Sequence, residues 1–247
     1  ACFNTALGAQ ALRNNTTASV NAAVGACALY TNTTGCRNYA FGYRALTLNT
    51  TGCSNIAIGY AALCCNTTAN QNTAVGGWSM WKNSTGHSNT ASGYYSLAQN
   101  TTGNYNTAMG LKALFTNSTG TENTADGNGA LQNNTTGSWN TGIGQGALYT
   151  NTTGCCNTAL GKFALFANIT GKENVAVGMH ALGSALCSFN TAVGRGALCG
   201  TTTGVCNVGV GFNTMRHNTS GHSNTAHGME ALYANTTGTL NTALGRS

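Results

Sequence analysis

Few residues of this chain could perform catalysis or hold a metal. Its 247 residues include eleven cysteines and five histidines but only four carboxylates. Acid–base catalysis and carboxylate metal sites need such groups in pairs or clusters. The carboxylates are Glu122, Asp126, Glu173 and Glu230. The sequence therefore predicts no catalytic residue, no metal site and no cofactor.

Three of the histidines, His217, His222 and His227, lie close together in the sequence, with Glu230 as the nearest carboxylate. They occupy different positions of the repeat described below, so we expect their side chains to be solvated and not to converge on one metal ion. No serine or cysteine is accompanied by a histidine and an acid that would suggest nucleophilic catalysis. We expect the chain not to be an enzyme.

The cysteines indicate disulfide bonds. None of them forms a C-x-x-C pair, which argues against zinc. Cys36 and Cys53 are 17 residues apart, the length of one repeat, so their Cα atoms should lie about 5 Å apart, within disulfide range. A disulfide there would indicate an oxidising compartment. The alternative is a set of small buried thiols.

A single repeat covers the whole chain. Its consensus is N-T-A-x-G-x-x-A-L-x-x-N-T-T-G-x-x, and we number its positions from the opening Asn, which is Asn4 in the first unit. The unit is 17 residues long throughout except once, where 16 residues separate Asn174 from Asn190. The chain therefore contains fourteen full units and a fragment of a fifteenth.

The repeat length predicts an all-β fold. Seventeen residues are too few for a pair of helices, and the Gly at position five of every unit would weaken a helix. We expect a parallel β-solenoid, a β-roll or β-helix, of about fourteen 17-residue coils, with residues 1–247 as one domain uncapped at both ends. At about 4.8 Å per coil the rod would be roughly 65 to 70 Å long.

Three positions bear on the core. Position nine is Leu in twelve units and Met in two, which predicts a buried column that includes Leu114. Position three is Ala or Gly, and position four is mostly large and apolar. Since neighbouring strand residues point to opposite faces, either position four fills the interior, or position three does and position four forms an apolar stripe outside. An outer stripe would need a partner.

The 16-residue unit, Asn174 to Phe189, tests the assignment of strands and turns. Its residues Ala176, Gly178, Ala181 and Leu182 all keep their consensus positions. The missing residue must therefore fall after them, in the N-T-T-G turn. We predict that the strand of this coil stays in register with both neighbours, and that the opening Asn residues form a ladder of side-chain amides.

The N-T-A-x-G-x-x-A-L motif resembles the head repeats of trimeric autotransporter adhesins and the N-T-A-x-G…A-L…N-T-T-G repeats of tail-fibre-like surface proteins. The resemblance covers the whole chain. It implies a β-roll or β-solenoid head or stalk that is extracellular, often trimeric, and used for attachment or as a shaft.

Position twelve carries an Asn-x-Ser/Thr acceptor in twelve of the fourteen full units. One interpretation is an N-glycan on nearly every coil; the other is turn chemistry alone, with Asn capping the turn. An aromatic residue two positions before the Asn in six units could cover the first sugar. The predicted glycosylation sites are Asn15, Asn32, Asn49, Asn66, Asn83, Asn100, Asn117, Asn134, Asn151, Asn168, Asn218 and Asn235.

The charged residues do not indicate a particular partner. Charged residues make up 6% of the chain, and the formal charge of +6 comes from ten scattered Lys and Arg. No basic run suggests nucleic acid, and no apolar run approaches the roughly 18 residues of a membrane span. We therefore expect no nucleic-acid partner and no membrane span.

Three non-enzymatic functions remain open. The first is an extracellular or cell-surface structural protein, N-glycosylated once per coil, whose uncapped β edges stack end to end into a fibril, with Cys2 as a possible bridge. The second is a trimeric adhesin or tail-fibre-like shaft in which three chains bury the position-four stripe. The third is ice binding, which is disfavoured because Thr at position two is interrupted in five units.

Overall fold

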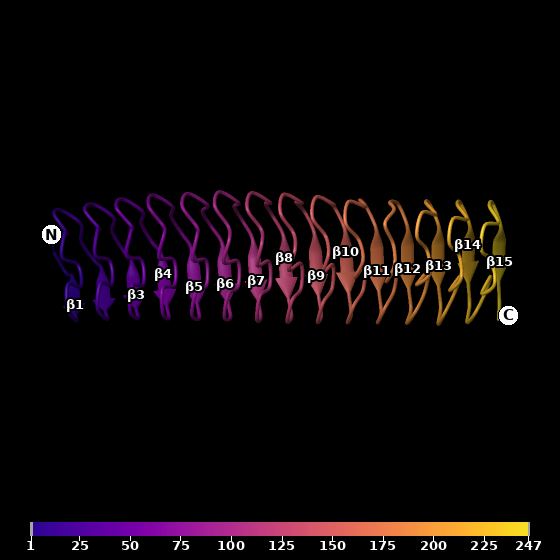
Figure 1. Ribbon diagram of the computed structural model, residues 1–247, viewed down its shortest axis with the longest axis horizontal. Coiled ribbons are helices and arrows are strands. Elements are labelled where there is room, and N and C mark those ends of the chain that lie inside the picture. The colour runs from indigo at the N-terminus through magenta and orange to yellow at the C-terminus, as the bar shows by residue number, and fades with distance from the viewer. Residues whose placement is uncertain (1, 247) are drawn as a thin grey trace. The chain divides into compact units, whose positions relative to one another are not determined.

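The computed structural model describes residues 2–246, and the chain forms two compact units, residues 1–122 and 123–247. Every strand of the described residues is three residues long and occupies positions two to four of its repeat. Within each unit, Figure 1 shows the strands of successive coils side by side. The first unit contains β1 (Thr5–Leu7), β2 (Ala22–Val24), β3 (Tyr39–Phe41), β4 (Ile56–Ile58), β5 (Thr73–Val75), β6 (Thr90–Ser92) and β7 (Thr107–Met109). The second contains β8 (Thr124–Asp126), β9 (Thr141–Ile143), β10 (Thr158–Leu160), β11 (Val175–Val177), β12 (Thr191–Val193), β13 (Val208–Val210), β14 (Thr225–His227) and β15 (Thr242–Leu244).

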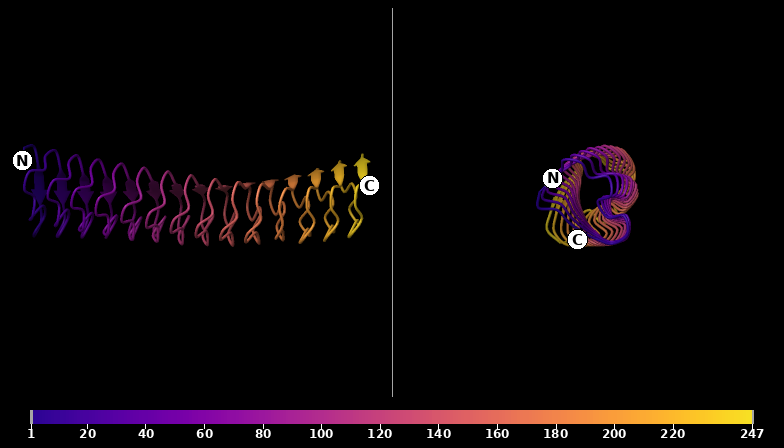
Figure 2. Two further views of the ribbon diagram at one scale, coloured as in Figure 1. Left: turned by 90° about the horizontal axis from the view of Figure 1, so that it is seen from above. Right: turned by 90° about the vertical axis from the view of Figure 1, so that its left-hand side faces the viewer.

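Within each unit the strands are parallel and pair between equivalent positions of successive coils (Figure 2). Ala40 of β3, for example, pairs with Ala57 of β4. The segment after each strand is paired between coils too: Leu46 N donates to Ala62 O at 3.0 Å. This architecture confirms the predicted all-β parallel solenoid.

Strand burial resolves the conflict between positions three and four. In β4, Ala57 is fully buried, whereas Ile58 is 42% exposed. The same alternation holds in other strands, because only the small position-three side chain fits the interior of the coil. Position four therefore forms an apolar stripe outside.

The position-nine column is the core. Leu114 is fully buried, as predicted, and so are the position-nine residues from Leu29 to Met215. All of them have a left-handed backbone; φ of Leu46, for example, is 51°. A β-branched residue is strongly disfavoured in that conformation, which explains why the column uses Leu and Met and never Ile or Val.

Positions seven and seventeen are also left-handed, as Arg44 (φ 57°) and Ser54 (φ 60°) show. These positions hold many residue types, but Val20 is the one β-branched residue at either of them. The Gly at position five has a different requirement. A Cβ on Gly59 would lie 2.6 Å from the carbonyl carbon of Gly76 in the next coil. Only glycine, which has no Cβ, therefore allows the coils to stack this closely.

The shortened coil keeps its register, as predicted. Val175 of β11 pairs with Thr158 on one side and Thr191 on the other. The turn absorbs the missing residue. In the preceding coil, Asn157 Nδ2 donates to Gly171 O, 14 residues further along the chain. In the shortened coil, Asn174 Nδ2 donates at 2.8 Å to Cys187 O, only 13 residues further along.

Candidate functional site

The outward side chains of the strands form a continuous surface in each unit, which we call the outer sheet face and define as repeat positions two and four. In the first unit it contains no charged residue. Ile58 and Met109 are 42% and 46% exposed. Its members are Thr5, Leu7, Ala22, Val24, Tyr39, Phe41, Ile56, Ile58, Thr73, Val75, Thr90, Ser92, Thr107 and Met109. At about 4.8 Å per strand, this face is about 30 Å long.

The outer sheet face of the second unit follows the same pattern. Ile143 and Val193 are exposed apolar residues at position four. Asp126 and His227 occupy the same position, so the strand accepts a charged or polar side chain there without losing its conformation. This face thus repeats an outward apolar side chain in most of the strands of the second unit.

The opening Asn residues form the predicted amide ladder. The backbone N of Asn55 donates to Asn38 Oδ1 at 3.0 Å, and Asn55 Nδ2 donates to the same oxygen at 3.1 Å. Nδ2 also donates to Ala69 O at 2.8 Å. Each buried amide thus satisfies backbone groups of its own coil and of its neighbour.

The sequon Asn residues form a second ladder inside the coils. Asn49 Nδ2 donates to Asn32 Oδ1 at 2.8 Å and to Gly52 O at 2.9 Å. Asn49 Oδ1 accepts from Asn66 Nδ2 at 2.8 Å. Gly52 O also accepts from Asn38 Nδ2 at 2.7 Å, so one carbonyl joins the two ladders.

This ladder is at odds with the predicted glycans. An N-glycan is attached to Nδ2, and here Nδ2 is the buried donor. The fully buried sequon residues are Asn32, Asn49, Asn66, Asn83, Asn100, Asn117, Asn134, Asn151, Asn168 and Asn218. Asn15 and Asn235 are partly exposed. Burial supports the alternative interpretation, in which N-T-T-G serves the turn.

The aromatic residues two positions before the sequons do not need a sugar to cover them. Tyr149 and Phe166 stack on each other with ring centroids 5.3 Å apart and an interplanar angle of 13°. Lys82 Nζ lies 5.5 Å from the Trp81 ring. Rings that recur at the coil spacing cover one another's faces. The 17-residue spacing of Tyr149 and Phe166 could have predicted this stacking from the sequence.

We expect deglycosylation to leave the intact mass of the folded protein unchanged, apart from any glycan at Asn15 or Asn235, or at Asn14 and Asn133, which also begin an Asn-x-Thr acceptor and are not fully buried. The reason is that a glycan on a buried Nδ2 would replace a ladder donor and could not fit inside the coil. The measurement is the intact mass of folded chain from a secretory eukaryotic host, before and after treatment with peptide N-glycosidase. More than four glycans on the folded chain would contradict the ladder, because at least one would then be on a buried sequon Asn.

The second ladder breaks at the shortened coil. Position twelve is Ala185 there and Thr201 in the next coil. Two buried oxygens lack a hydrogen-bond partner among the described residues, Asn168 Oδ1 and Thr201 Oγ1. Asn168 Oδ1 faces the coil that carries Ala185, which has no amide to donate.

Thr201→Asn is expected to raise the free energy of unfolding by about 1 kcal/mol. The new amide could donate to Gly204 O and accept from Asn218 Nδ2, as its counterparts do in other coils, and it would remove one unpaired hydroxyl. Chemical denaturation of both proteins measures the change. Thr202→Asn, on the partly exposed neighbour, is the control and should have little effect.

The structure brings the predicted disulfide pair together. The Sγ atoms of Cys36 and Cys53 are 3.1 Å apart, and both are free thiols. Contact with Cys53 raises the pKa of Cys36. The disulfide itself stays a prediction.

Cys64 and Cys65 form a second thiol pair, which sequence analysis did not single out. A hydrogen bond from Cys64 and the charges of Arg44 and Lys82 lower the pKa of Cys65 to about 7, against the opposing effect of burial. The same contact and burial raise the pKa of Cys64. The lowered pKa gives Cys65 more thiolate character than an ordinary cysteine at neutral pH.

The clustered histidines do not converge. His227 is exposed on the outer sheet face, and the ring of His217 packs against Tyr233 with centroids 4.8 Å apart. Within residues 2–246, no group of three His, Cys, Asp or Glu side chains could hold a metal ion. Over the same residues, no helix is long and apolar enough to span a membrane.

Comparisons with known proteins add no relationship: no protein-family model, curated protein or solved structure matches the chain.

Proposed function

We propose that this chain is a non-enzymatic structural repeat protein whose copies pack side by side through the outer sheet face, outside the cell or on its surface. The observation that supports this proposal is the outward-facing apolar column at position four, which Ser92 interrupts in the first unit and Asp126 and His227 in the second. Contiguous apolar surface of this kind is typical of an interface.

The partner that fits this face best is another copy of the same chain. Two identical faces that meet bring like charges together wherever a charge occurs, which is destabilising. The outer sheet face of the first unit has no charged residue among its fourteen members, so it meets its own copy without that cost. Position two holds a short Thr or Ala in five of the seven strands of this unit, where the position-four side chains are free to interdigitate, whereas Tyr39 and Ile56 add apolar surface of their own.

The resemblance to adhesin and tail-fibre repeats favours a shaft of three chains. End-to-end stacking into a fibril is a second arrangement, and it uses coil edges instead of the outer face. The extracellular assignment rests on the adjacent thiols of Cys36 and Cys53, which are placed for a disulfide.

The test is the sedimentation of wild type and of a double variant, Ile58→Asp with Val75→Asp. Both residues are exposed at position four, and Asp126 shows that a strand accepts Asp there. We expect the wild type to sediment as an oligomer of defined size at micromolar concentration and the variant as a single chain with unchanged circular dichroism. Four facing carboxylates per pair of chains would repel each other.

The matched control is Leu48→Asp. Leu48 is 41% exposed, like Ile58, but lies outside the strands. This variant should retain the oligomer. A wild type that sediments as a single chain, or an oligomer that survives the double substitution, would contradict the proposal. Filaments longer than one chain in micrographs of the double variant would favour end-to-end stacking instead.

A further inference from the structure

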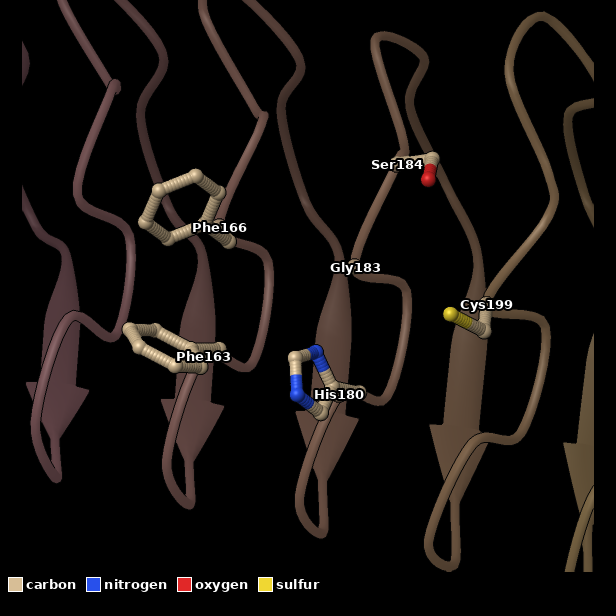
Figure 3. Close-up of a pocket in the computed structure, with 6 residues that line it drawn as sticks. All are labelled: Phe163, Phe166, His180, Gly183, Ser184 and Cys199. Atoms are coloured by element: carbon tan, nitrogen blue, oxygen red, sulfur yellow. The ribbon is translucent and has the colours of Figure 1, made fainter.

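Three adjoining hollows open on the surface of the second unit, beside the shortened coil. Cys199 lines all three, and the largest has a volume of about 320 Å³. Figure 3 shows that its walls come from successive coils, with Phe163 and Phe166 on one side, Cys199 on the other, and His180 and Gly183 between them. A volume of this order is the lower end of the range for small-molecule sites.

The hollow exists because a row of stacked rings stops there. Tyr149 and Phe166, both at position ten, stack at 5.3 Å. The next position-ten residue is Gly183, so nothing at that position covers the second face of Phe166. Phe163 makes a T-shaped contact with Phe166, with ring centroids 5.2 Å apart, and lines the same hollow. A planar ring that entered the hollow would continue the stack.

The remaining lining groups favour a negative charge. Arg195 and Arg216 line the adjoining hollow together with His180, and His217 lines the third. No carboxylate is among the residues that line any of the three. The Arg216 guanidinium is held by a 2.9 Å bond from Nη1 to Asn213 Oδ1, which leaves its other N–H groups to bind an anion.

The geometry points to a binding site for a small aromatic anion, such as an aryl phosphate or aryl carboxylate. Its ring stacks on Phe166 in the place left open by Gly183, and its anionic group reaches Arg216 and Arg195. This site is separate from the outer sheet face and does not depend on self-association.

Titration with phenyl phosphate, followed by calorimetry, tests the site. We expect phenyl phosphate to bind at least tenfold more tightly than inorganic phosphate, which lacks the ring, or phenol, which lacks the anion. Arg216→Gln should weaken phenyl phosphate at least tenfold and leave phenol unchanged, because it removes the charged donor alone.

Gly183→Phe fills the hollow with the ring that other coils carry at position ten. A Cβ on Gly183 would lie 3.3 Å from His180 O, its nearest atom, so the chain must shift by a few tenths of an ångström. We expect the variant to fold, as circular dichroism will check, and to lose binding at least tenfold. Gln132→Phe, at position ten of a distant coil, is the control and should bind normally. Equal affinity for phenyl phosphate and phosphate, or full binding by folded Gly183→Phe, would overturn the proposal.

Discussion

Replacing Asn49 by alanine is expected to lower the free energy of unfolding by about 3 kcal/mol. The substitution removes three buried hydrogen bonds, two donated by Nδ2 and one accepted by Oδ1. It also leaves Asn32 Oδ1 buried without its donor, a state that costs about 1 to 3 kcal/mol. Urea denaturation followed by circular dichroism measures the loss.

The matched control is Asn14→Ala. Asn14 is exposed and lies outside both ladders, so the change should stay within about 0.5 kcal/mol. If Asn49→Ala proved as mild as Asn14→Ala, the Asn49 amide would not be part of a buried ladder. Asn49→Asp should be at least as harmful as alanine, since it keeps the acceptor but puts a carboxylate in place of the donor.

Leu114→Ala is expected to cost about 2 to 5 kcal/mol. Leu114 is fully buried within the position-nine column, and truncation leaves a cavity that the neighbouring coils can close only in part. The measurement is again the urea transition. A decrease in the free energy of unfolding of less than about 1 kcal/mol would mean that Leu114 is not tightly packed in a buried core.

Leu114→Ile separates packing from backbone conformation. Ordinary exchanges that conserve side-chain volume cost less than about 1.5 kcal/mol. At this position φ is 50°, where a β-branched side chain adds strain of about 1 to 3 kcal/mol. We therefore expect Leu114→Ile to be clearly worse than Leu114→Met, which restores the residue type found at Met80 and Met215.

The periodicity was sufficient to predict the coils, the Leu column and the register of the shortened unit. Spacing fixes which residues stack on which, because each coil must pair with the next. Spacing alone could not decide whether Ala57 or Ile58 points inward. That depended on the width of the coil interior, which accepts only the small position-three side chain and which residue spacing does not specify.

The candidate sites were harder to predict. The sequon pattern at Asn49 is identical whether the amide carries a glycan or donates to Gly52 O, so residue identity could not separate the two interpretations. The thiol pair of Cys36 and Cys53 followed directly from the 17-residue spacing. The hollow beside Gly183 exists because Gly183 carries no ring where Tyr149 and Phe166 of the preceding coils do. The sequence shows this difference, but not that position ten lies on the surface.

The central claim is that two ladders of asparagine amides are buried inside the coils beside the position-nine Leu column, while the position-four side chains lie outside. Hydrogen exchange of the side-chain amides tests it most directly, by NMR on the Ile58→Asp, Val75→Asp variant after transfer into D₂O. We predict Asn Nδ2 signals that persist for hours, in sets corresponding to both ladders, whereas signals from exposed amides such as Asn14 vanish within minutes. Loss of every side-chain amide signal within minutes, from a chain whose backbone amides remain protected, would contradict the account.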